Sequence, residues 1–335
     1  MRPKAPTLRD VARLAGVSSA TVSRALERPA MVGEATRQRV LAAVERSRYV
    51  PNAQARKLRR QQADAVILLV RDIANPFYLD IFRGVEAVAS AAGLDLLMGN
   101  ASDDVARIRH HFRMVRERHA DGLVLMTGKL PEADAMAGVP VVAALEYFPG
   151  LALPTVRIDN AGAGAQAVRH LIGLGHRRVA HVTGPLAGVM SVERMAGWRR
   201  GMRAAGLPAG DELVARGDFT IPSGHRAVAA LFARRPYPTA VFCSSDTMAF
   251  GVVNELRARG LEVPRDVSVV GFDDLVLAGD FHPSITTIRQ PCFEIGRTAM
   301  RLLVDLIGGQ PAPRRHVVMP TELVVRGSTA APRRS

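Results

Sequence analysis

Between residues 7 and 26, the pattern of apolar and polar positions predicts two short helices. Apolar residues recur at i, i+3, i+4 and i+7 in the first helix and give it one buried face: Leu8, Val11, Ala12 and Ala15. Thr7 and Asp10 have the spacing of a capping box at its start, and Gly16 ends it. Ser18 then caps the second helix almost at once. Two helices joined by a tight turn that contains glycine form the helix-turn-helix pattern.

The second helix has two faces of different character. Val22, Ala25 and Leu26 form its apolar stripe. The opposite face carries short side chains and one long cation, namely Ser19, Ala20, Ser23 and Arg24. Such a helix fits the major groove of DNA, because its exposed face is slim and carries donors for base edges. The alternative is an ordinary helical hairpin at the start of a globular domain.

A third helix is predicted to begin after Gly33 and to end at residues 49–52. Its inward face is expected to consist of Val40, Leu41 and Val44. Residues 53–60, AQARKLRR, follow it, and Leu58 is their single large apolar residue. From the residues alone, two interpretations of Leu58 stay open. It is either an accident of a linker or an apolar wedge for the minor groove, with the neighbouring arginines on phosphates.

From residue 66 onward, apolar runs alternate with helical stretches. The runs predict strands at residues 66–70, 94–98, 122–126, 139–144, 178–183, 240–244 and 267–271. Continuous apolar strands between helices indicate parallel sheets that are covered on both faces. A break at residues 154–160 divides this body into two similar α/β halves. Because ligands bind beyond the carboxyl ends of parallel strands, the cleft between the halves is the expected small-molecule site.

Positive charge is concentrated at one end of the chain. The 335 residues carry a formal net charge of +14. Residues 1–60 hold fourteen Lys and Arg against four Asp and Glu, an excess of ten, so only +4 remains for the other 275 residues. This distribution predicts a module that binds a polyanion, attached to a nearly neutral body.

The sequence argues against several other classes of protein. Its apolar runs are too short for a membrane span, and Arg9, Asp10 and Arg13 interrupt any signal-peptide core, so a cytoplasmic protein is expected. Cys243 and Cys292 lack the spacing of metal or redox sites and are expected to be buried thiols. No glycine-rich nucleotide loop, catalytic triad or metal-ligand set is apparent, so neither an enzyme nor a cofactor is expected. A binding protein for transported solutes would share the two halves but not the basic module.

Several motifs make the chain resemble the lactose-repressor family of bacterial transcription factors. The first 52 residues contain LRDVA at 8–12, VSxxTVSR at 17–24, TR at 36–37 and YxPN at 49–52. The body contains VxIDN at 156–160, GHxxV at 175–179, SDxMA at 245–249, GFDD at 271–274 and TTI at 286–288. Within the family, the resemblance is closest to members that respond to a nucleoside such as cytidine. It rests there on LPT at 153–155, RGDFT at 216–220 and the segment at 290–297.

The resemblance implies a small all-α helix-turn-helix domain followed by a two-lobed α/β core like that of periplasmic binding proteins, with parallel sheets. The expected boundaries are 1–52 for the DNA-binding domain, 53–62 for a hinge and 63–335 for the effector-binding and dimerisation core. The two lobes would comprise about 63–160 with 290–320, and about 161–289 with 321–330. The expected DNA contacts are Ser18, Ser19, Ala20, Thr21, Arg24, Asn52, Ala55 and Leu58. Leu58 matches the family's minor-groove lever, which favours the wedge interpretation.

The resemblance also implies an effector site in the cleft. Its expected contacts are Phe77, Tyr78, Arg194, Phe219, Asp246, Asp273 and Gln290. A carboxylate that accepts from two vicinal hydroxyls, beside a guanidinium that donates to oxygens, suits a sugar or the ribose of a nucleoside. Phe219 could stack on a base or on a hexose face. Alternatives stay open for Phe77, as part of a lobe core, and for Asp246, as a brace at a helix start.

The expected function is a transcriptional repressor that is modulated by a small molecule. A nucleoside is the leading effector, and a sugar-responsive repressor of a carbohydrate-utilisation operon is the alternative. We expect a homodimer on a pseudo-palindromic operator, because one recognition helix contacts only a few base pairs. Residues 326–335 contain no heptad repeat, so we expect dimers rather than tetramers. A partner activator protein is a further expected contact, and a membrane is not.

Overall fold

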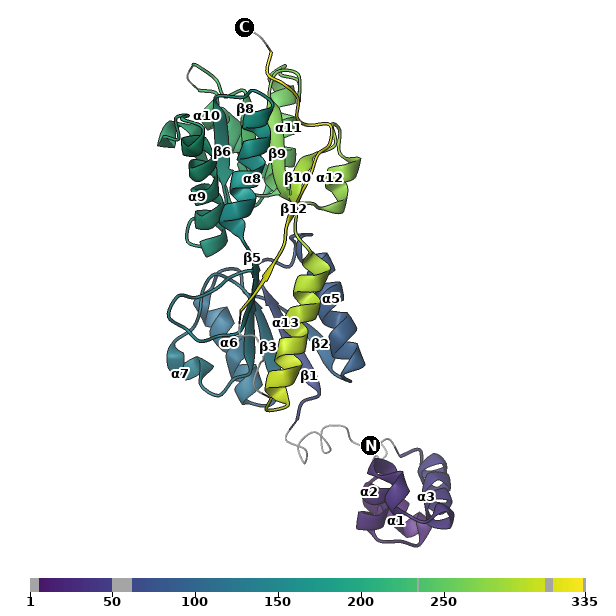
Figure 1. Ribbon diagram of the computed structural model, residues 1–335. Coiled ribbons are helices and arrows are strands. Elements are labelled where there is room, and N and C mark those ends of the chain that lie inside the picture. The colour runs from purple at the N-terminus through teal and green to yellow at the C-terminus, as the bar shows by residue number, and fades with distance from the viewer. Residues whose placement is uncertain (1–5, 50–61, 234, 311–315, 334–335) are drawn as a thin grey trace. The chain divides into compact units, whose positions relative to one another are not determined.

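The computed structural model describes residues 6–49, 62–233, 235–310 and 316–333 (Figure 1). The chain divides into two compact units, Met1–Gln62 and Ala63–Ser335, and we describe each by itself. Among the residues described, no helix is long and apolar enough to cross a membrane.

The first unit consists of short helices around a small core. They are α1 (Leu8–Ala15), α2 (Ser19–Glu27), the 3₁₀ turn η1 (Pro29–Met31) and α3 (Glu34–Ser47). The buried core residues are Val11, Ala12, Ala15, Val22, Ala25, Val40 and Ala43. The predicted helix pair and its apolar faces are confirmed.

Local hydrogen bonds fix the ends of these helices. The Thr7 side chain accepts from the backbone N–H of Asp10, whose carboxylate accepts from the backbone N–H of Thr7 at 2.9 Å. Gly16 ends α1 in the left-handed region at φ 65°. The prediction that Leu41 faces inward is wrong, because this side chain is 44% exposed. It lies about 100° around the helix from Val40 and so misses the inward face.

The second unit contains two six-stranded sheets with the orders β11-β5-β4-β3-β1-β2 and β12-β10-β9-β8-β6-β7. The first comprises β1 (Ala65–Val70), β2 (Asp95–Asn100), β3 (Gly122–Met126), β4 (Val141–Ala144), β5 (Thr155–Ile158) and β11 (His316–Met319). The second comprises β6 (Val179–Thr183), β7 (Val214–Arg216), β8 (Ala240–Cys243), β9 (Ser268–Asp273), β10 (Thr286–Arg289) and β12 (Glu322–Val324). Strand pairs are parallel except for β10 with β12. We call the two halves the N-terminal and the C-terminal lobe.

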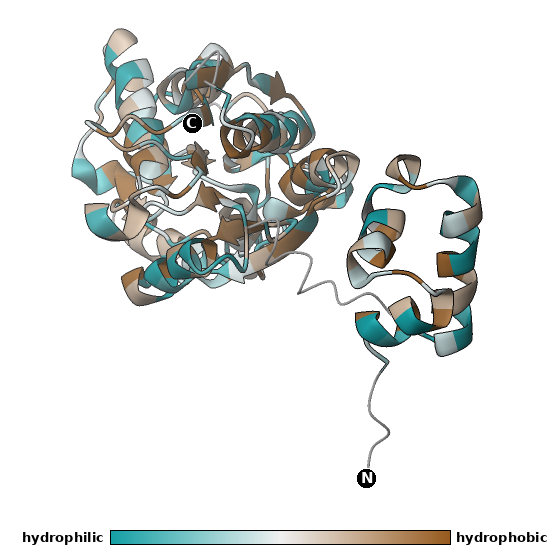
Figure 2. Ribbon diagram, turned by 90° about the horizontal axis from the view of Figure 1, so that it is seen from below, coloured by the Kyte–Doolittle hydropathy of each residue, from teal (hydrophilic) through white to brown (hydrophobic). Residues whose placement is uncertain are grey.

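Helices cover both faces of each sheet, as predicted. The N-terminal lobe has α5 (Tyr78–Ala91), α6 (Val105–Arg116), α7 (Ala133–Met136) and α13 (Cys292–Ile307). The C-terminal lobe has α8 (Asn160–Gly173), α9 (Val189–Ala204), η2 (Asp211–Leu213), α10 (Ile221–Leu231), α11 (Asp246–Ala258) and α12 (Val276–Asp280). Alternate residues of β1 serve opposite faces: Leu68 belongs to the core under α5 and α13, and Ile67 to the core under α6. Figure 2 accordingly shows hydrophobic residues on the strands and hydrophilic ones on outer helix faces.

The chain crosses between the lobes three times: from β5 to α8, from β10 to α13, and from β11 to β12 (Figure 1). The predicted fold class is confirmed, and the seven predicted strands lie within about two residues of observed ones. The break expected at 154–160 is wrong in one respect, because β5 lies inside it. That strand has four residues, and one of them is Arg157, so its apolar signal is weak.

Candidate DNA-binding surface and effector site

The exposed face of α2 has the residue types that base recognition needs. Ala20 and Arg24 are exposed, and Ser19 and Ser23 are half-buried. These four residues line a groove of about 510 Å³, together with Leu8, Arg28 and Met31. Within the part of this unit that the structure describes, Arg13 pairs with Asp10 and Arg37 with Glu34, whereas Arg24 has no ion pair. Its guanidinium is therefore available to a ligand.

The start of α2 is the part of this face where backbone N–H groups point outward. Ser18 caps it, because its hydroxyl accepts from the Thr21 backbone N–H at 3.1 Å and lies 2.9 Å from the Thr21 hydroxyl. Both hydroxyls are thus at the helix end that favours an anion such as a phosphate. Asn52, Ala55 and Leu58 lie outside the described residues, so their predicted DNA contacts stay predictions.

In the second unit, a buried arginine on α9 is the centre of the candidate effector site. Arg194 is 2% exposed, and its guanidinium lies 3.6 Å from the centroid of the Phe272 ring. Its Nε donates to Asn160 Oδ1 at 2.9 Å, and its Nη1 donates to the backbone carbonyl of Ser244 at 2.6 Å. The same Nη1 lies 3.7 Å from Asp273 Oδ1. Among the described contacts, Nη2 has no partner and remains as a donor.

Asp273 ends β9 in an unusual backbone conformation. Its φ is 112°, and that of Asp274 is 58°, so two successive non-glycine residues have positive φ. Each such residue stores roughly 1–3 kcal/mol of strain, and such strain clusters at functional sites. Gln290 Nε2 donates to Asp273 Oδ1 at 2.7 Å, while the buried Gln290 Oε1 has no hydrogen-bond partner. Burial raises the pKa of Asp273 to about 7, against the opposing effects of Arg194 and Gln290.

Aromatic side chains from both lobes lie at the strand ends. Phe77 and Tyr78 are buried and meet edge to face, with ring centroids 5.3 Å apart. Phe219 is half-buried, and the guanidinium of Arg71 lies 5.6 Å from the centroid of its ring. Since Arg71 belongs to the N-terminal lobe and Phe219 to the C-terminal lobe, this contact joins the two lobes. The low exposure of Phe77 leaves its alternative role in the lobe core open.

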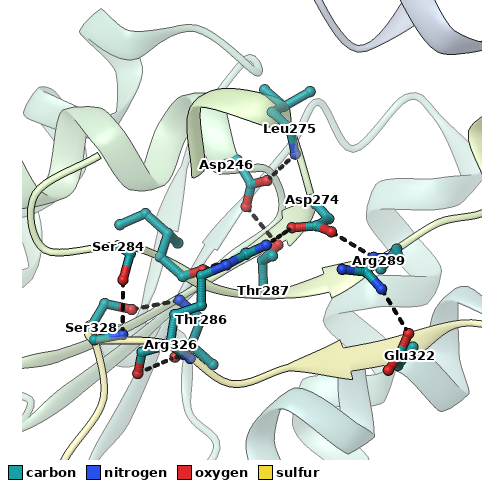
Figure 3. A network of polar contacts seen from close by, with 12 residues as sticks. Asp246, Asp274, Leu275, Ser284, Thr286, Thr287, Arg289, Glu322, Arg326 and Ser328 are labelled. Carbon is teal, nitrogen blue, oxygen red and sulfur yellow. Dashed lines mark hydrogen bonds and ion pairs between the residues drawn. The ribbon is translucent and has the colours of Figure 1, made fainter. Parts of the chain in front are cut away.

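Asp246 is fully buried, and the protein uses both of its carboxylate oxygens (Figure 3). Thr287 Oγ1 donates to Oδ1 at 2.6 Å, and the backbone N–H of Leu275 donates to Oδ2 at 2.8 Å. Burial, followed by the charge of Asp273, raises the pKa of Asp246 well above its usual value. These contacts give Asp246 a structural role, because it joins the loop after β9 to β10. The alternative that it braces a helix start stays a prediction.

Glu146 belongs to this region although the sequence analysis did not identify it. It is 5% exposed and follows β4, and the backbone N–H groups of Val189 and Met190 at the start of α9 donate to it. Burial raises its pKa to about 7, while those bonds and Arg194 act in the opposite direction. The contact crosses from the N-terminal to the C-terminal lobe. The rule that ligands bind at carboxyl ends of strands could have identified both Glu146 and Arg71.

A cavity of about 730 Å³ lies between α5, α12 and α13. It is lined by three of the predicted effector contacts, Phe77, Asp273 and Gln290, but not by the other four, Tyr78, Arg194, Phe219 and Asp246. Its volume falls within the range of about 300–1,000 Å³ that is usual for small-molecule sites. Among the described residues, no group of three or more His, Cys, Asp and Glu could hold a metal ion.

Comparison with known proteins decides the family. The model of bacterial regulatory proteins of the lacI family matches residues 7–52, and that of the periplasmic binding protein-like domain matches residues 168–329. The HTH-type transcriptional repressor CytR of Escherichia coli (strain K12) is 38% identical over 331 residues, which are 98% of this chain and 97% of that protein. This chain belongs to the lacI family. It is a DNA-binding transcriptional repressor with an effector-binding domain, as the sequence motifs predicted.

Other relatives support the same assignment. The HTH-type transcriptional regulator CelR of Thermobifida fusca is 38% identical, over 98% of this chain and 99% of that protein. The structure of the lac repressor dimer bound to operator and the anti-inducer ONPF superposes with a TM-score of 0.86 at 27% identity, and it covers 98% of this chain and 100% of that one. A CelR–cellobiose complex gives a TM-score of 0.75 at 37% identity, over 96% and 99% of the two chains. These relatives are regulators, not enzymes.

Burial of Glu146 predicts a pH dependence of stability. Its pKa of about 7 in the folded protein exceeds the 4.5 of an exposed Glu, so the folded state binds the proton more tightly. Its contribution to stability is present below pH 4.5 and is lost as the pH rises through about 7. As the pH rises from 5 to 8, the free energy of unfolding of Glu146→Gln should therefore increase by about 2–3 kcal/mol relative to that of the unsubstituted protein.

Denaturant unfolding of both proteins across this pH range measures the difference. Asp273 titrates in both proteins, so its contribution cancels in the comparison. A difference in stability that stays constant from pH 5 to 8 would show that Glu146 is not held in a desolvated site.

Proposed function

We propose that the chain is a homodimeric repressor that binds a pseudo-palindromic operator and is modulated by a nucleoside such as cytidine. The observation that carries the effector assignment is the group of polar atoms around Asp273. It offers a carboxylate, the unpartnered Gln290 Oε1 and the remaining donor of Arg194. Such a group complements the vicinal hydroxyls and ring oxygen of a ribose.

On the DNA side, α2 would enter the major groove through its exposed face. Arg24 can donate two hydrogen bonds to O6 and N7 of a guanine, which is worth roughly 1–3 kcal/mol of discrimination. Ser19 and Ala20 would contact neighbouring base edges. Ser18 and Thr21 would bind phosphates, which fixes the position of the helix without selecting a sequence.

A sugar is the second candidate for the effector. The specific observation in its favour is the similarity to CelR, which was solved in complex with cellobiose and is 37% identical to this chain. The hydroxyls of a hexose suit Asp273 and Arg194 as well as those of a ribose do. Phe219 can stack on a sugar face or on a base, so the ring does not favour either.

A second copy of the chain would cover apolar side chains that are exposed in the second unit. Leu79 on α5 is 55% exposed, and Val276 and Leu277 on α12 are 79% and 52% exposed. They lie in the two lobes and line the cavity of about 730 Å³, so a dimer that buries them would be held by both lobes and would cover this cavity. The lac repressor, which is similar to this chain, was solved as a dimer on its operator. A repressor of this kind acts in the cytoplasm, and a contact with a partner activator stays a prediction.

For the DNA surface, we expect Arg24→Ala to reduce both operator affinity and preference at one base pair in each half-site. The loss should be about 1–3 kcal/mol per half-site on the operator and smaller on random DNA. Binding titrations on an operator and on a scrambled duplex measure both effects.

Arg37→Ala is the matched control. If Arg37 contacts only phosphate, its loss should weaken both duplexes alike and reduce the dependence of binding on salt. An equal loss on both duplexes for Arg24→Ala would contradict its assignment to base recognition.

For the effector site, we expect Asp273→Ala to bind the operator but neither to bind the effector nor to release the operator in its presence. The carboxylate that would accept the hydroxyls is gone, whereas the DNA-binding surface lies in the other unit. A thermal-shift screen with cytidine, other nucleosides and cellobiose identifies the class of effector. Operator release by the active compound is then measured for both proteins. The cleft assignment fails if Asp273→Ala binds that compound and responds to it as the unsubstituted protein does.

A further inference from the structure

The two aspartates at the end of β9 have separate sets of partners. Asp273 accepts from the Gln290 amide at 2.7 Å and faces Arg194. Asp274 Oδ2 accepts from Arg289 Nε at 2.6 Å. Arg289 and Gln290 are also consecutive residues, at the end of β10. Two neighbouring side chains of one segment therefore bind two neighbouring side chains of the other.

This pairing joins the effector site to two of the three crossovers between the lobes. Arg289 is the last residue of β10, and Gln290 leads from it to α13 in the N-terminal lobe. Arg289 Nη1 also lies 3.0 Å from Glu322 Oε2, and Glu322 begins β12, which arrives from β11. Asp274, Arg289 and Glu322 thus form a chain of ion pairs across both crossovers.

Further bonds anchor Asp274 within the C-terminal lobe. Its Oδ1 lies 2.6 Å from Arg326 Nη2, and Arg326 Nη1 donates to the carbonyl of Ile285 at 2.9 Å. The next residue, Leu275, donates its backbone N–H to Asp246. The side chain of Asp274 is 9% exposed, while that of Arg289 is 48% exposed. The buried Asp274 carboxylate therefore holds the more exposed Arg289, which lies at the crossover.

We propose that Asp274 is a positioning residue that transmits occupancy of Asp273 to the crossovers. This inference rests on the proposed function, since it takes Asp273 as an effector contact. A ligand that binds both Asp273 and the unpartnered Gln290 Oε1 engages both members of this hydrogen-bonded pair, so occupancy shifts Gln290 and the crossover that contains it. The Asp274–Arg289–Glu322 ion pairs then transmit this shift to the crossover between β11 and β12. The effector then changes the lobe arrangement by its differential affinity for the two states.

Asp274→Asn tests the proposal, because it removes the charge and keeps the shape. The probe is cytidine, and the coupling factor is the ratio of the operator Kd values with and without it. We expect cytidine affinity within about threefold of the unsubstituted protein and a coupling factor reduced at least about fivefold. Asp211→Asn, which removes one carboxylate of an exposed 2.8 Å ion pair in the same lobe, should change neither quantity. An unchanged coupling factor, or equal losses of affinity and coupling, overturns the proposal.

Arg289→Gln tests the same ion pair independently, from its other partner. It should reduce coupling as Asp274→Asn does, and the double variant should lose no more than either single variant. Additive losses would mean that the two residues act separately, which contradicts the ion-pair chain.

A measurement without effector separates this proposal from the proposed function. If neither cytidine nor cellobiose changes operator binding by the unsubstituted protein, the proposed function fails. Amide hydrogen exchange in peptides that cover residues 286–290 and 321–324 still tests the role of Asp274. Faster exchange in Asp274→Asn than in Asp211→Asn supports the attachment of the crossovers, and unchanged exchange overturns it.

Discussion

The buried ion pair between Arg194 and Asp273 is the interaction on which the candidate effector site depends. Removing both charges from water is costly, so the pair persists only because further bonds satisfy its atoms. Asn160 and the Ser244 carbonyl hold the guanidinium, and Gln290 holds the carboxylate. These bonds leave one guanidinium nitrogen and one amide oxygen without a partner among the described contacts. A polar ligand would complete the set.

Polar contacts join the two lobes close to the same site. Gln290 lies in a crossover, and Glu146 and Arg71 contact the opposite lobe directly. Charges and hydrogen bonds, which a ligand can replace, therefore hold the lobes together near the effector residues. A continuous apolar core at this place would resist such an exchange. Asp274 adds ion pairs with Arg289 and Arg326 immediately beside this site.

The sequence predicted the elements whose signals are local. The capping box of Thr7 and the strand over residues 122–126 follow from spacing and composition, and the structure has both. Leu41 was assigned to the wrong face because it is apolar and adjacent to Val40. Residue type alone does not show which of two neighbouring apolar residues points inward. Glu146 was missed although it closely follows a predicted strand, because its burial results from contact with the opposite lobe, which no local pattern encodes. The sequence left two roles open for Asp246, effector contact and brace, and its bonds to Thr287 and Leu275 required coordinates.

The proposed nucleoside effector requires Asp273 and Arg194 to bind the vicinal hydroxyls of its ribose. Calorimetric titration of the unsubstituted protein with cytidine and with 2′,3′-dideoxycytidine tests it most directly, because the two ligands share the base and differ in those hydroxyls. We expect cytidine to bind and the dideoxy compound to bind at least about a hundredfold more weakly, since two buried polar groups would be left unpaired. Equal affinity for the two compounds would contradict the assignment of Asp273 and Arg194 as the hydroxyl-binding pair.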